Sequence, residues 1–234
     1  MRPPIASAEG PDIKSPGIKN PGIKNPGIKG PEIKICGITS AEAFDAAVGG
    51  GADWIGFVFY ARSPRSITAD EAARLSARRM GGPGRVGLFV DPDPAMIAAV
   101  LATVALDALQ LYGEPSRLAG LGRHFGLPVW RAVGVASAND LPTESSAARL
   151  VVDAKPPAGA ARPGGNAQRL DWSLLRGWAA PAPWMLAGGL NPANVAAALT
   201  ATDARAVDVS SGVETAPGVK SPRLIRAFIE AARG

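Results

Sequence analysis

The chain has 234 residues, of which 47% are hydrophobic and 19% charged, as is typical of a globular domain with one substantial core. Its formal net charge is +5, but residues 1–31 carry five basic against two acidic side chains, so the rest of the chain lacks the concentrated positive charge of a nucleic-acid-binding domain. The single cysteine excludes an intrachain disulfide and a cysteine-based metal cluster, and no apolar run reaches the roughly 18 residues of a membrane span.

The N-terminal segment contains a repeat of five residues. The first ten residues, MRPPIASAEG, lack the apolar stretch of a signal peptide, so we expect a cytoplasmic protein. DIKSP, GIKNP, GIKNP and GIKGP then follow one another over residues 12–31, each with a proline that forbids a regular helix or a central strand. We therefore predict that residues 1–31 are a flexible or polyproline-like extension and that residues 32–234 form the folded domain.

From Glu32 onward, short apolar runs alternate with segments of helical spacing. Strands are predicted at residues 32–36, 54–59, 85–90, 108–112, 129–135, 149–153, 184–187 and 206–209. A helix is predicted after each strand, beginning near Ser40, Thr68, Pro94, Ser116, Ser137, Asp171, Pro192 (after the N-cap Asn191) and Ser221. Eight such units predict parallel strands joined by right-handed crossovers, as in a single-domain (β/α)8 (TIM) barrel of the α/β class. An open doubly wound sheet is the alternative, although the first turn, Cys36-Gly37-Ile38-Thr39, lacks a dinucleotide-binding glycine pattern.

In a barrel of this kind, functional side chains lie at the carboxyl ends of the strands. The candidates at those ends are Cys36, Arg65, Gln110, Tyr112, Asp153 and Asp208. The loops after the seventh and eighth strands contain small residues, Gly188-Gly189 and Ser210-Ser211-Gly212, that would let backbone N–H groups approach a phosphate. Ordinary tight turns are the alternative interpretation, but this pair of loops is where such barrels often bind phosphate, and we expect a phosphorylated small-molecule substrate.

Cys36 and Asp153 are the candidates for proton transfer. A cysteine between apolar residues is usually a small buried hydrophobe, but at a strand mouth its thiolate could remove a proton from carbon if positive charge lowers its pKa. Lys34 has the same strand parity and is expected to pair with an inward carboxylate such as Asp208, as a structural pair or with a catalytic role. Asp153 ends an apolar strand, where an aspartate is hard to explain by packing, and a cap on the next loop is the alternative to a functional role. His124, the only histidine, is expected at a helix end away from the site, so a histidine-based triad is not expected.

Ordered sequence blocks identify a family that this chain resembles. The segment Lys34–Thr39, KICGIT, resembles the opening signature of phosphoribosylanthranilate isomerases. Further matches follow in order: GADWIGFVFYARSPRSIT (51–68), VGLFVD (86–91), LQLYG (109–113), DW (171–172), LAGGLNPANV (186–195) and VDVSSGVETAPGVKS (207–221). The resemblance covers residues 32–234, and it implies a (β/α)8 barrel that catalyses an Amadori rearrangement in tryptophan biosynthesis without a cofactor or a metal.

The resemblance also implies roles for individual residues. Cys36 matches the general base, Asp153 the general acid, and Arg65 the arginine that binds the anthranilate carboxylate. The phosphate is expected at Gly188, Gly189, Ser210, Ser211 and Gly212 and at Gly165 in the loop after the sixth strand, and Gln110 and Asp208 are further expected substrate contacts. Tyr112 replaces the usual histidine of the family, and residues 164–167 read GGNA instead of GGTG, so affinity or rate is expected to differ. We expect a monomer or a homodimer.

Two other functions remain open at this stage. The related sugar-phosphate isomerase of histidine biosynthesis performs the same rearrangement, as do dual-substrate isomerases, but these resemble one another in using an aspartate where this chain has Cys36. A barrel that binds phosphorylated ligands without turning them over would suit the altered residues 164–167. Measurement of turnover, as opposed to binding alone, separates these possibilities.

Overall fold

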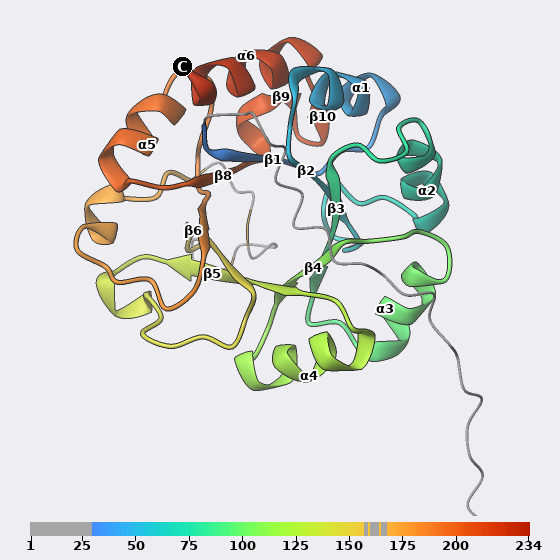
Figure 1. Ribbon diagram of the computed structural model, residues 1–234, viewed down its shortest axis with the longest axis horizontal. Helices are drawn as coiled ribbons and strands as arrows, with labels where there is room; N and C mark the ends of the chain where they lie inside the picture. Colours follow the sequence, from blue (N-terminus) through green and yellow to red (C-terminus); the bar gives the residue numbers. More distant parts are fainter. Residues whose placement is uncertain (1–29, 157–158, 160–163, 165–167) are drawn as a thin grey trace, which may run out of the picture.

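Eight parallel strands form a closed barrel that is surrounded by helices (Figure 1). The computed structural model describes residues 30–156, 159, 164 and 168–234. The barrel strands are β1 Glu32–Cys36, β2 Trp54–Val58, β3 Gly84–Val90, β4 Ala108–Tyr112, β5 Val129–Val135, β6 Arg149–Ala154, β7 Trp184–Leu186 and β8 Ala206–Val209. Each strand pairs with its neighbours in sequence, and β1 pairs with β8 to close the ring, with Lys34 opposite Asp208. The predicted (β/α)8 architecture is therefore confirmed, and each strand boundary lies within one residue of its predicted position.

The helices follow the predicted starts at most of the strand ends. They are α1 Ala41–Gly50, α2 Ala69–Ala77, α3 Pro94–Leu101, α4 Pro115–Phe125, α5 Val195–Thr202 and α6 Pro222–Arg233. Ser40, Thr68 and Ser221 cap their helices as predicted, because each side chain accepts a hydrogen bond from a backbone N–H in the first turn. None of the helices within the described residues is long and apolar enough to cross a membrane.

Two predicted helices form only short 3-10 turns at their predicted starts, and a third begins later than predicted. After β5, the segment from Ser137 forms only the 3-10 turn η1 Ala138–Asp140, because Pro142 forces the preceding Leu141 into an extended conformation. After β6, the segment from Asp171 forms only the 3-10 turn η2 Trp172–Leu175, which precedes Gly177 with its positive φ of 73°. Helix α5 begins at Val195 with Asn194 as its N-cap, three residues later than the predicted Pro192 start.

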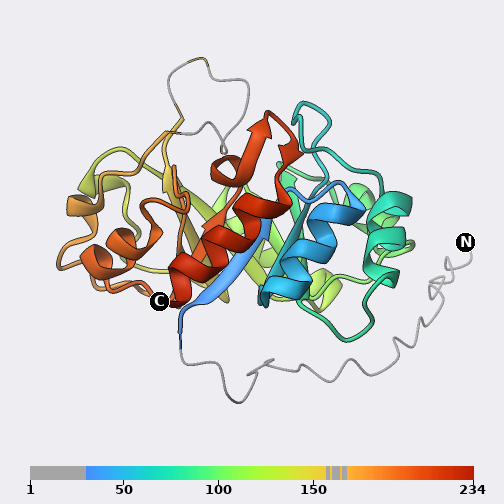
Figure 2. The ribbon, with the colours of Figure 1, turned by 90° about the horizontal axis from the view of Figure 1, so that it is seen from above.

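A short hairpin that was not predicted follows β8. The 3-10 turn η3 Ser211–Val213 leads into strands β9 Glu214–Ala216 and β10 Val219–Lys220, which pair antiparallel outside the barrel sheet. The hairpin projects from the same end of the barrel as the loop between β2 and α2 (Figure 2). Its position brings Glu214 and Lys220 to the carboxyl ends of the barrel strands.

The two ends of the barrel interior differ in chemistry. An apolar cluster within the barrel includes Val86, Trp130, Val151 and Met185, with Trp54 packed against it. The carboxyl ends of the strands instead bring together a thiol, carboxylates, an amide and ammonium groups, described below. The apolar cluster therefore fills part of the barrel, while the polar side chains gather at the carboxyl ends of the strands.

Candidate active site

One pocket at the carboxyl ends of the strands contains most of the predicted site residues. Those that line it are Cys36, Arg65, Gln110, Asp153, Gly188, Gly189, Asp208, Ser210 and Ser211. Gly212 is not among the lining residues and lies instead against the backbone carbonyl of Leu190, where the loops after β7 and β8 meet. Gly165, together with Asn166 and Ala167, lies outside the described residues. The sequence thus predicted where the pocket lies. Of the predicted site residues that the structure describes, all but Gly212 line it.

Lys34 is fully buried and does not itself line the pocket, but it contacts Asp208 and Gln110, which do. Its Nζ donates hydrogen bonds to Asp208 Oδ1 at 2.9 Å and to Gln110 Oε1 at 2.8 Å, and it lies close enough to Cys36 for the two groups to affect each other's pKa. Burial alone would lower the pKa of Lys34, but the charges of Asp208 and Cys36 and the hydrogen bond to Asp208 outweigh it, and the net effect is a raised pKa. The predicted Lys34–Asp208 pair is confirmed, and its ammonium charge lies next to the thiol.

The thiol of Cys36 lies in a buried position with mixed charges around it. Burial raises the pKa of Cys36, as does Asp208, whereas Lys34 and Lys220 lower it, and the net effect is a raised pKa. The protonated thiol is therefore favoured at neutral pH. The two ammonium groups are the charges that favour the thiolate, which is the form that can accept a proton.

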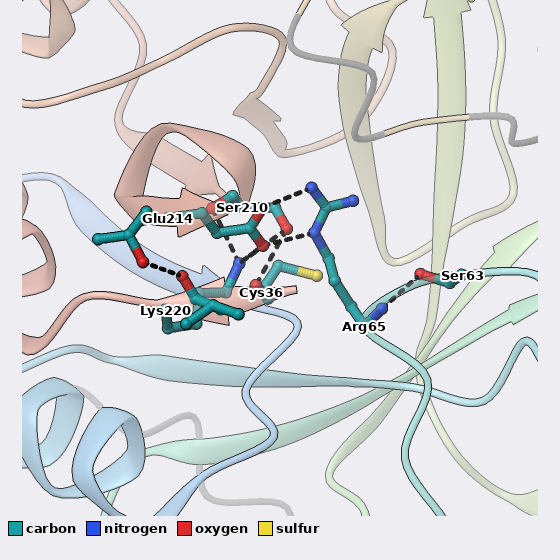
Figure 3. A network of polar contacts seen from close by, with 8 residues as sticks. Cys36, Ser63, Arg65, Ser210, Glu214 and Lys220 are labelled. Atoms are coloured by element: carbon teal, nitrogen blue, oxygen red, sulfur yellow. Dashed lines mark hydrogen bonds and ion pairs between the residues drawn. The ribbon is translucent and has the colours of Figure 1, made fainter. Parts of the chain in front are cut away.

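Arg65 reaches the pocket from the loop after β2. Gly37 has a positive φ of 76°, and a Cβ at this position would lie 2.7 Å from the Arg65 Cδ, so a glycine is needed where the arginine stem passes. At its other end the guanidinium forms a bidentate pair with Glu214, Nε to Oε1 at 2.7 Å and Nη2 to Oε2 at 2.9 Å (Figure 3). Both side chains are about 95% buried. The arginine is thus fixed at its stem and at its head.

Lys220 connects this ion pair to the loop after β8. Its Nζ donates to Glu214 Oε1 at 2.7 Å, to the Ser210 carbonyl at 2.8 Å and to Ser210 Oγ at 3.1 Å. The Ser210 hydroxyl in turn donates to the Cys36 carbonyl at 3.1 Å, so its proton is used within the protein (Figure 3). Burial lowers the pKa of Lys220 to about 8, although Glu214 acts in the opposite direction.

Asp153 lies in β6, from which the ring continues through β7 and β8 to β1 and Cys36. Its Oδ1 accepts a hydrogen bond from the backbone N–H of Ala154 at 2.7 Å, and a Cβ on Gly188 would approach this oxygen to 3.1 Å. A Cβ on Gly164 would meet both the Tyr112 hydroxyl and Asp153 Oδ2, so the phenol and the carboxylate are close neighbours. Burial and the charges of Asp153, Cys36 and Asp208 raise the pKa of Tyr112 well above its usual value, so it is a neutral donor here.

Glu214 and Lys220 were not predicted as site residues from the sequence. Both lie within the sequence block that ends at Ser221, but neither ends a barrel strand, and their burial depends on how the hairpin folds over the barrel. The signal that was available is Pro217-Gly218 between two short segments, which is typical of a turn. His124 lies in the last turn of α4 against Phe125 and does not line the pocket, as predicted. No metal-binding group of three or more His, Cys, Asp and Glu side chains occurs among the described residues.

Comparisons with known proteins agree with this geometry. The family model for N-(5'-phosphoribosyl)anthranilate isomerase matches residues 33–231. A protein of that name from Acidiphilium cryptum is 54% identical over 200 residues, which are 85% of this chain and 97% of the relative. The crystal structure of the isomerase from Thermotoga maritima is 38% identical with a TM-score of 0.74, over 87% of this chain and 98% of that one. A crystal structure in complex with reduced 1-(o-carboxyphenylamino)-1-deoxyribulose 5-phosphate is 37% identical with a TM-score of 0.73, over the same shares. The chain therefore belongs to the N-(5'-phosphoribosyl)anthranilate isomerase family, and it is an isomerase of tryptophan biosynthesis.

Proposed function

We propose that this isomerase converts N-(5'-phosphoribosyl)anthranilate into 1-(2-carboxyphenylamino)-1-deoxyribulose 5-phosphate, with Asp153 as general acid and Cys36 as general base. The observation that carries the proposal is that a thiol and a carboxylate from β1 and β6 line one pocket, with positive charge next to the thiol. An Amadori rearrangement needs one acid and one base within reach of a single sugar.

The proposed reaction begins at the ring oxygen of the ribose. Asp153 donates a proton to this oxygen, the bond between it and the anomeric carbon breaks, and the nitrogen lone pair forms the protonated imine. Cys36 then removes the proton from C2', and the electron pair of that bond forms the enolamine. A final tautomerisation moves the proton of the C2' hydroxyl to C1' and gives the ketose. The Cys36 thiol then releases a proton to solvent and Asp153 takes one up, so both groups regain their starting states and the isomerisation gains or loses no atom.

Arg65 and the loops after β7 and β8 are proposed to orient the substrate. The guanidinium is a suitable partner for the anthranilate carboxylate, which it can bind by charge-assisted hydrogen bonds. Gly188, Gly189 and Ser211 line the pocket next to Ser210, and their backbone N–H groups are proposed to bind the phosphate, together with Gly165. Gln110 and Asp208 also line the pocket and are proposed to contact the sugar. Binding at both ends of the substrate would fix the reacting carbon between acid and base.

The test is turnover of phosphoribosylanthranilate, followed by the loss of substrate fluorescence, for the parent protein and for Cys36→Ala and Asp153→Asn. We expect each variant to lose on the order of 10²–10⁴-fold in kcat, the usual contribution of a general acid or base. Binding of the reduced product analogue serves as the control, because both variants should still bind it if the pocket is intact. A folded parent protein that binds this analogue without turnover would support a binding-only barrel, and full activity of Cys36→Ala would contradict the assignment of the base.

A further inference from the structure

We propose that Glu214 and Lys220, on the β9–β10 hairpin, are positioning residues that hold the Arg65 guanidinium for the carboxylate of the substrate. The proposal rests on the function proposed above, because it assigns a role to two residues around the same site. Neither residue lines the pocket, so both would act on the substrate through Arg65.

Glu214 and Gly37 restrict the orientation of the Arg65 side chain. An arginine side chain has many rotamers, and a guanidinium must present its donors in the right plane to bind a carboxylate. Glu214 fixes that plane through two parallel hydrogen bonds of 2.7 and 2.9 Å, and the close approach of Gly37 restricts the stem. Because a guanidinium has five N–H donors, a bidentate pair with Glu214 is compatible with a second carboxylate at another edge.

Arg65, Glu214 and Lys220 form a cluster with a net positive charge. Arg65 and Glu214 alone form a neutral pair, which would give little attraction for an anion. Lys220 contacts the same Glu214 oxygen that accepts from Arg65 Nε, and it adds one positive charge to the cluster. Two cations and one carboxylate leave a net charge of +1, which matches the single carboxylate of the anthranilate ring.

Hydrogen bonds connect this cluster to the loop after β8 and to β1. Lys220 also binds the Ser210 carbonyl and hydroxyl, and that hydroxyl donates to the backbone of Cys36. Figure 3 shows this continuous path from the guanidinium of Arg65 to the strand that carries the thiol. A shift of the hairpin would therefore move the carboxylate subsite relative to the base and to the loop after β8.

The test compares two ligands, the reduced product analogue and the same compound without its aromatic carboxyl group. Their dissociation constants give the preference of the protein for the carboxylate, which we expect to be about ten- to a hundredfold for the parent, as for charge-assisted hydrogen bonds. In Glu214→Gln we expect this preference to fall about tenfold or more, while the carboxyl-free ligand binds within about twofold of the parent. If Glu214 had only a structural role, the variant would bind both ligands more weakly by a similar factor.

The change in charge distinguishes the proposed geometric role of Glu214 from a simple effect of charge on binding. Glu214→Gln raises the net charge of the cluster, so a site governed only by charge would bind the carboxylated ligand more tightly. A preference that is unchanged or increased would overturn the proposal. Glu214→Asp keeps the charge and withdraws the carboxylate by one methylene, and it should also lose preference. This variant keeps the proposal testable if Glu214→Gln does not fold.

A matched control is available at the surface. Asp45 forms an exposed bidentate pair with Arg78, and neither residue lines the pocket. Asp45→Asn should leave both dissociation constants and KM unchanged, whereas Glu214→Gln should raise KM more than it lowers kcat. If the parent itself shows neither turnover nor a carboxylate preference, the proposed function fails. If the parent shows both and Glu214→Gln and Glu214→Asp keep the full preference, only the role of the hairpin is refuted.

Discussion

Lys34 donates hydrogen bonds to the Asp208 carboxylate and to the Gln110 amide, and its charge acts on the neighbouring Cys36 thiol. A buried ammonium needs such partners because its desolvation is costly, and Asp208 supplies the opposite charge. The same ammonium lowers the pKa of Cys36 against the effect of burial. Sequence parity predicted the pair but left its role open between structure and catalysis. The geometry is compatible with both, since the contact that keeps Lys34 charged also places that charge beside the thiol.

The pH dependence of the reaction tests this effect of Lys34. A thiolate base is active only when deprotonated, so kcat/KM should rise as pH increases through the pKa of Cys36. Lys34→Met removes the nearer positive charge and raises that pKa further, so the rise should move to higher pH. Lys155→Met is a suitable control, because Lys155 forms an exposed pair with Asp140, and its profile should match that of the parent. An unshifted profile for a folded Lys34→Met would contradict the electrostatic role.

At the scale of elements, the β9–β10 hairpin touches the loop that carries Arg65. Gly218 has a positive φ of 85°, and a Cβ there would lie 2.3 Å from the backbone carbonyl oxygen of Pro64, the residue before Arg65. A backbone atom cannot rotate away as a side chain can, so a larger residue must push the hairpin and the loop apart. The hairpin therefore positions Arg65 by two routes, the ion pair with Glu214 and this close backbone contact.

Gly218→Ala should therefore affect both stability and substrate affinity. We expect a loss of about 1–3 kcal/mol in the free energy of unfolding from the positive φ, measured by urea denaturation, and a severalfold increase in KM from the displaced Arg65 loop. Gly81→Ala is the matched control, because Gly81 has a φ of 66° with no atom near the position of its Cβ. The control should lose stability with an unchanged KM. A similar KM in both variants would show that the hairpin contact does not reach Arg65.

The charge of the hairpin should also appear in the pH dependence of binding. Lys220 has a pKa of about 8, set by burial and opposed by Glu214, with Arg65 and Cys36 as the other charged neighbours and Ser210 as a neutral one. Below this pH Lys220 is charged and the cluster has its net positive charge, which is lost as pH rises through the pKa. In the Cys36→Ala variant, the preference for the carboxylated ligand should decline above about pH 8. In the double variant Cys36→Ala/Lys220→Met, the preference should not change between pH values below and above 8. A decline that persists without Lys220 would assign it to another group.

At the scale of the whole molecule, the sequence predicted the barrel because each strand is a short apolar run bounded by turn residues. The same regularity predicted the pocket, since the carboxyl ends of parallel strands converge on one face. The helices expected after β5 and β6 failed where a local signal overrode the pattern, namely Pro142 after η1 and Gly177 after η2. Glu214 and Lys220 were missed for a different reason. Their segment has no apolar periodicity, and only the packing of the hairpin on the barrel buries them.

The contacts between β1 and β8 that close the barrel begin at residue 32, the proposed start of the folded domain, so deletions can test this boundary. Glu32 begins the β1–β8 ladder, and its carboxylate accepts hydrogen bonds from Trp54 and Arg149, while Ile33 is fully buried. We propose that deletion of residues 2–31 leaves kcat/KM and the thermal midpoint nearly unchanged, because every described residue of the pocket follows that boundary. Deletion of residues 2–33 should instead destabilise the protein by about 1–3 kcal/mol, because it removes the hydrogen bonds of Glu32 with Trp54 and Arg149 and places the charged N-terminus of Met1 at the buried position of Ile33. A large loss of activity in the shorter deletion would show that residues 2–31 belong to the working fold, and equal stability of both deletions would show that closure of the barrel does not depend on the start of β1.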